Sequence, residues 1–137
     1  MNTHPYLRAY MAGVMIPTIF LLVVFIFFAV IRFGYNPGFP LERALVFPLA
    51  LVPAIWGVWN IVYVAMQGRH RLPLGMHGAV VPAVLLPLAL LAARVFGFEF
   101  VAGATPFVLL ALPLLMIIYY LVWKYLVGFL NAMLGIA

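Results

Sequence analysis

The chain contains no Cys, no Ser and no Asp, and its only carboxylate side chains are Glu42 and Glu99. The absence of cysteine excludes disulfides, thiol redox chemistry and cysteine metal sites. A serine or cysteine nucleophile is excluded as well, and no aspartate is present to orient a catalytic histidine. Because only His, Lys, Tyr and two Glu remain as acids, bases or nucleophiles, we expect a non-catalytic protein.

Charged residues are also scarce: they make up 7% of the 137 residues, whereas 69% are apolar, and the mean hydropathy is +1.28. An average soluble domain is about 25% charged and about 45–50% apolar. A small soluble domain keeps too much of its surface exposed to hide so many apolar side chains. The sequence therefore predicts a protein that is surrounded by lipid.

Four long stretches lack Lys, Arg, Asp and Glu altogether, namely residues 9–31, 44–68, 72–93 and 100–123. A bilayer core of about 30 Å needs about 20 helical residues. The stretches are rich in Leu, Val, Ile and Phe without strict alternation, which favours helices over barrel strands. We expect an all-α integral membrane protein with a single domain, a four-transmembrane-helix antiparallel bundle. The predicted helices cover residues 9–32, 44–67, 75–95 and 105–127, and residues 128–137 either extend the last helix or lie along the interface.

The distribution of cations predicts the orientation of these spans. We expect the first span to remain in the protein, because its apolar run exceeds the 7–15 residues of a cleavable signal. With a cytoplasmic N-terminus, the inside holds Arg8, Arg69, Arg71 and Lys124, and the outside holds Arg32, Arg43 and Arg94. This excess predicts that both termini are cytoplasmic. We also expect the chain to lie in the inner (cytoplasmic) membrane.

Six prolines fall inside the predicted spans: Pro17, Pro48, Pro53, Pro82, Pro87 and Pro113. Each removes one backbone donor and crowds the carbonyl four residues earlier, which predicts proline-kinked helices. Such kinks can open a cavity between the second and third helices. Alternatively, the prolines are simply tolerated within packed transmembrane helices.

One face of the second span carries polar and aromatic side chains at helical spacing, Trp56, Trp59, Asn60 and Tyr63. Tyr119, Tyr120 and Lys124 lie at a comparable depth on the fourth span. Together these residues predict a pocket between helices two, three and four that suits a lipid, quinone or isoprenoid. The alternative is that Asn60 holds two helices together and that the aromatic residues form an interfacial belt.

A basic segment precedes the third span, with Arg69, His70 and Arg71 in the connection and His77 near the helix start. Cations beside a helix N-terminus suit a lipid phosphate, although they also serve as a plain positive-inside anchor. His77 is a possible axial ligand for a haem or pigment, but a lone histidine there more often contacts a headgroup or the backbone. We therefore expect no cofactor. We also expect no metal site, because His4, His70 and His77 lack a fourth ligand.

The chemistry that remains points to assembly rather than catalysis. Transport of ions or protons normally leaves ionisable groups at mid-span, and none lies clearly there. Small residues at four-residue spacing, such as Gly75, Ala79 and Ala83, permit close helix packing. We expect an accessory or structural subunit of a membrane complex, or a self-assembling bundle. Its partners are membrane lipids and other transmembrane subunits or copies of itself, and no nucleic acid is expected. The alternative is a binder or carrier of a lipid-like molecule.

Overall fold

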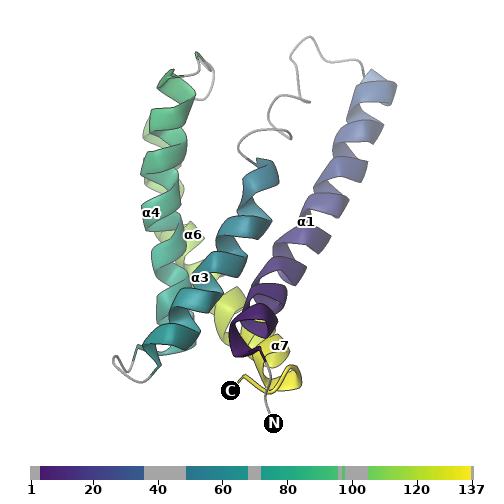
Figure 1. Cartoon of the computed structure of the whole chain (residues 1–137). Helices are drawn as coiled ribbons and strands as arrows, with labels where there is room; N and C mark the ends of the chain where they lie inside the picture. The colour runs from purple at the N-terminus through teal and green to yellow at the C-terminus, as the bar shows by residue number, and fades with distance from the viewer. Residues whose placement is uncertain (1–3, 36–48, 68–71, 96, 98–104, 137) are drawn as a thin grey trace. The chain divides into compact units, whose positions relative to one another are not determined.

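A computed structural model describes residues 4–35, 49–67, 72–95, 97 and 105–136, and within these ranges all regular structure is helical. The elements are α1 (Pro5–Tyr35), the 3₁₀ turn η1 (Leu49–Leu51), α3 (Val52–Met66), α4 (Leu74–Val95), α6 (Thr105–Val122), the π-helical segment η2 (Trp123–Val127) and α7 (Gly128–Met133) (Figure 1). Helices are the expected outcome for such apolar segments, because in lipid each backbone N–H and C=O must find its partner within the segment.

Four helical stretches in the described part of the chain are long and apolar enough to cross a membrane. They are Pro5–Tyr35, Leu49–Met66, Leu74–Ala92 and Leu109–Met133. The prediction of an all-helical membrane protein with four apolar spans is thereby confirmed, and the chain is a multi-pass membrane protein. The first helix begins at Pro5, four residues before the predicted start. Proline suits this place because the first helical N–H groups have no intrahelical partner to lose.

The chain forms two compact units. Unit 1 contains Met1–Met66 and Leu130–Ala137, and unit 2 contains Gln67–Phe129, so that the boundary falls inside α7. Unit 1 thus combines the first two spans with the C-terminal residues, and unit 2 contains α4, α6 and η2.

In unit 1, α1 and α3 approach closely at a pair of glycines. A Cβ atom on Gly13 would lie 2.5 Å from the carbonyl oxygen of Trp56, and a Cβ on Gly57 would lie 2.6 Å from the ring of Tyr10. Only glycine permits such an approach of two helix backbones. Since residue 9 contacts residue 60 and residue 13 contacts residue 56, the two helices run in opposite directions.

In unit 2, α4 packs against α6 and η2 through two further glycines. A Cβ atom on Gly75 would lie 2.8 Å from the ring of Tyr120, and one on Gly78 would overlap the side chain of Trp123. Trp123 is fully buried as a result. The bulkiest aromatic side chain of this unit therefore lies against a helix position that has no side chain of its own.

The prolines occupy two kinds of position. Pro17, Pro82, Pro87 and Pro113 lie inside helices. Pro53 is the second residue of α3 and follows the 3₁₀ turn η1 directly, at the change from 3₁₀ to α-helical structure. Pro48 lies outside the described residues, and the predicted kinks remain a prediction.

The last span ends in a well-defined cap. Residues 128–133 are helical and follow η2 directly, and whether this segment extends the span or lies along the interface remains a prediction. Gly135 then adopts the left-handed conformation with φ +66°. Its N–H donates to the carbonyl of Ala132 at 3.1 Å, and the N–H of Ile136 donates to that of Asn131 at 2.9 Å. These two bonds are those of a Schellman motif, which satisfies the last carbonyls of a helix.

The two ends of the described chain meet within unit 1. The guanidinium Nη1 of Arg8 donates a hydrogen bond of 3.2 Å to the carbonyl oxygen of Leu134. Figure 1 shows α7 (yellow) beside the first turns of α1 (purple). A cation at this place is favourable, because the C-terminal end of a helix carries a partial negative charge.

Candidate functional site

A pair of buried side-chain amides lies in unit 1. Asn60 on α3 is fully buried, and Asn131 on α7 is 2% exposed. Nδ2 of Asn60 donates to Oδ1 of Asn131 at 2.8 Å and to the carbonyl oxygen of Ala9 at 2.8 Å, while Nδ2 of Asn131 donates to Oδ1 of Asn60 at 3.2 Å. Three segments, α1, α3 and α7, thus meet at one buried polar point of unit 1.

Asn60 directs both of its donors to partners within unit 1. An Asn side chain offers two N–H donors and one carbonyl acceptor. Both donors of Asn60 are used, and its oxygen already accepts from Asn131. Ala9 and Ala12, both fully buried, are small enough to let the amides reach the α1 backbone. The arrangement holds helices together, and it leaves no donor of Asn60 for a ligand.

The other residues of the predicted pocket are divided between the two units. Trp56 is buried on α3 and its backbone faces Gly13, while Tyr63 is half-buried. Tyr119, Tyr120 and Lys124 belong to unit 2. The structure thus brings Trp56, Asn60 and Tyr63 onto one helix, and a pocket that joins them to the fourth span remains a prediction.

His77 is buried on α4, 7% exposed, and its ring lies edge-on to that of Trp123. The ring centroids are 6.1 Å apart and the interplanar angle is 65°. The backbone N–H of His77 donates to the carbonyl of Pro73 at 3.0 Å. His77 is therefore a packing partner of Trp123 in the first turns of α4. Arg69, His70 and Arg71 lie outside the described residues, so the predicted phosphate site that includes them remains a prediction.

Lys124 in η2 is exposed and lies near two tyrosine rings. Its Nζ is 5.8 Å from the ring centroid of Tyr120 and 5.1 Å from that of Tyr125. Both distances fall within the range in which an ammonium group is attracted by the face of an aromatic ring. The cation is thus held at the surface of unit 2 by its own neighbours along the helix.

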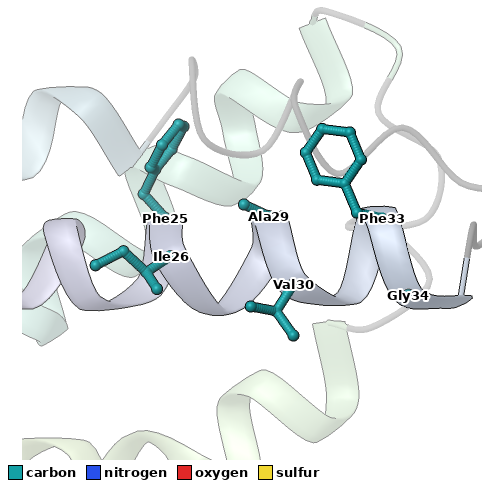
Figure 2. Close-up of a pocket in the computed structure, with 6 residues that line it drawn as sticks. All are labelled: Phe25, Ile26, Ala29, Val30, Phe33 and Gly34. Carbon is teal, nitrogen blue, oxygen red and sulfur yellow. The ribbon is translucent and has the colours of Figure 1, made fainter.

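An open hollow lies along the C-terminal half of α1, where Phe25, Ile26, Ala29, Val30, Phe33 and Gly34 line it. Figure 2 shows Phe25, Ala29 and Phe33 on one side of the helix and Val30 on another. The lining contains no polar side chain. Such a surface suits an acyl chain or an apolar helix, and it offers no group for catalysis.

Within the described residues, no group of three or more His, Asp or Glu side chains is placed to hold a metal ion. Reasoning from the sequence missed Asn131, the partner of Asn60. A signal was nevertheless present, because Asn131 is the one amide in the apolar segment from residue 105 to residue 137. A polar residue in such a segment is usually turned towards another helix.

Comparison with known proteins adds no relative. No protein-family model matches the chain, and neither the curated proteins nor the solved structures contain a match.

Proposed function

We propose that this protein is a small, non-catalytic integral membrane protein that acts as an accessory or structural subunit of a membrane complex, or that assembles with copies of itself. The observation that supports the proposal is that both donors of the buried Asn60 are used within the protein. In unit 1 the two buried amides bond to one another and to the α1 backbone. These two amides therefore serve helix packing.

The surface of α1 supports the same proposal. Every residue from 18 to 35 is exposed or half-buried, and this part of the helix includes the apolar hollow of Figure 2. Apolar side chains on a membrane helix are satisfied equally by lipid and by another apolar helix. A subunit that packs laterally against other transmembrane chains needs such a face.

The alternative function is a binder or carrier of a lipid-like molecule in a pocket between helices two, three and four. The aromatic side chains of Trp56, Tyr63, Tyr119 and Tyr120 favour it, since such rings suit a quinone or an isoprenoid. Asn60 argues against it, because its donors are already used within the protein. The lipid carrier is therefore the second candidate.

The proposed membrane arrangement is an antiparallel bundle of four proline-kinked helices in the cytoplasmic (inner) membrane, with both termini in the cytoplasm. The contact between Arg8 and the Leu134 carbonyl supports an even number of crossings, because it joins the two ends of the described chain. The small excess of Lys and Arg on that side favours the cytoplasm.

Two substitutions distinguish the two functions. Asn60→Leu removes the amide, and Tyr63→Phe on the same helix removes one hydroxyl from the predicted pocket. If packing is the role, Asn60→Leu lowers thermal stability or alters the assembly, and Tyr63→Phe has little effect. If a lipid-like molecule is carried, both variants lose a co-purifying small molecule while the assembly stays intact. The measurement is native mass spectrometry of the three proteins, with thermal unfolding of the same samples.

A further inference from the structure

Lys124 lies between Tyr120 and Gly128, two residues that approach the beginning of α4, where the third apolar span starts at Leu74. The beginning of a membrane span lies near the membrane–water interface. Within unit 2, the start of α4 is at the same level, because Gly75 contacts Tyr120 and Leu74 lies near Gly128. The beginning of one span and the end of another thus bracket Lys124.

Neighbouring residues of the same helix restrict the position of Lys124. The neighbouring Trp123 is fully buried against Gly78, which anchors this turn, while Lys124 itself is exposed. The rings of Tyr120 and Tyr125 lie 5.8 and 5.1 Å from its ammonium group. Contacts of this kind restrict a long side chain and so lower the entropy lost when the ammonium group binds a ligand.

An ammonium group at the interface attracts the phosphate of an anionic lipid. Tyrosine is also enriched at this level, because its ring is apolar and its hydroxyl is a hydrogen-bonding group.

We propose that Lys124, together with Tyr120 and Tyr125, binds the phosphate of an anionic phospholipid headgroup at the surface of unit 2. The ligand class is a lipid phosphate with net negative charge. A zwitterionic choline headgroup fits less well, because the ammonium of Lys124 repels the choline cation that accompanies the phosphate. This site shares Tyr120 and Lys124 with the predicted pocket of the alternative function but lies at the surface of unit 2, where Lys124 is exposed, and it does not depend on the proposed assembly role.

The test is native mass spectrometry of the full chain in detergent, titrated with phosphatidylglycerol and, separately, with phosphatidylcholine. Lys124→Gln is expected to weaken binding of the first phosphatidylglycerol about fivefold, the factor that corresponds to one surface lysine. Phosphatidylcholine binding is expected to stay unchanged. Lys124→Arg should retain binding, and Tyr125→Leu should cause a smaller loss, since this exposed ring only positions the ammonium group.

Arg94→Gln is the matched control, because Arg94 is an exposed cation at the end of α4 in the same unit. The proposal is overturned if Arg94→Gln and Lys124→Gln weaken phosphatidylglycerol binding equally, since the effect would then be net charge alone. It is also overturned if Lys124→Gln has no effect, or if it weakens phosphatidylcholine binding to the same extent. A parallel titration with inorganic phosphate distinguishes the two sources of phosphate: displacement of the lipid by phosphate at equal concentration would mean that the site binds the free anion.

Discussion

Asn60 and Asn131 are separated by 71 positions in the sequence, yet their side-chain amides exchange two hydrogen bonds inside unit 1. The carbonyl of Ala9 accepts the remaining donor of Asn60. A buried amide that loses its partner costs about 1–3 kcal/mol, and more than the bond itself contributes. This asymmetry makes the pair the most sensitive place at which to test the packing of unit 1.

The first prediction is a double-mutant cycle on the amide pair. Asn60→Leu or Asn131→Leu alone is expected to lower the free energy of unfolding by about 1–2 kcal/mol, because each leaves one buried amide unsatisfied. The double variant should lose less than the sum of the two single variants. Unfolding in a denaturing detergent, followed by circular dichroism, measures all three. Strictly additive losses would mean that the two amides do not interact.

The second prediction concerns the glycine contact between α1 and α3. Gly13→Ala is expected to destabilise the protein by about 1–3 kcal/mol, because the new methyl group must push apart two helix backbones. Gly34→Ala is the matched control on the same helix, since a Cβ there meets nothing within 4 Å. It should be neutral or slightly stabilising, as alanine is the better helix former. Equal effects of both substitutions on the unfolding midpoint would contradict the close crossing.

The amide pair and the glycines also mark the limit of what the sequence predicts. Four apolar helices follow from the long uncharged runs, because lipid imposes helix on any such segment. The sequence also singles out Asn60, because it is an amide within an apolar span. The sequence does not predict that Asn131 is the partner of Asn60, because a contact between residues 71 positions apart depends on tertiary packing. Gly13, Gly57 and Gly78 differ from Gly34 in the side chains and backbone that pack against them, which is a property of the tertiary structure.

The predicted pocket illustrates a second limit. The helical spacing of Trp56, Asn60 and Tyr63 on α3 predicts from the sequence alone that these residues share one helix face. Whether such a face meets a ligand or another helix depends on what packs against it. For Asn60 the structure supplies the answer, Asn131 and the Ala9 carbonyl. The sequence also does not show where the last helix ends, although glycine, the residue at position 135, is the type that commonly ends helices.

The third prediction concerns the tie between the two ends of the chain. Arg8→Gln removes the bond to the Leu134 carbonyl, so that amide hydrogen exchange at Gly135 and Ile136 should become faster. An increase of about tenfold corresponds to a hydrogen bond from a charged donor worth about 1.5 kcal/mol. Arg94→Gln, which removes an equal charge far along the sequence, should leave this exchange unchanged. Unaltered exchange in Arg8→Gln would show that Arg8 does not hold the C-terminal turn.

The fourth prediction is that both ends of the chain lie on the same side of the membrane. The absence of native cysteine makes a single introduced thiol a unique label. His4→Cys and Ile136→Cys, each alone, should react with a membrane-impermeant maleimide from the same side of sealed vesicles, and that side should be the cytoplasmic one. Labelling from opposite sides would require an odd number of crossings and would contradict the contact between Arg8 and Leu134.

The proposed role as a membrane subunit or self-assembling protein is tested most directly on the protein extracted gently from its own membranes. Native mass spectrometry of that sample, with an absorption spectrum recorded in parallel, identifies what remains bound. We expect either other transmembrane chains in fixed stoichiometry or a repeated mass of this chain, with no visible absorbance. A lone protomer that carries one small lipophilic molecule would contradict the proposal and favour the carrier, and visible absorbance would show that His77 or another residue binds a pigment.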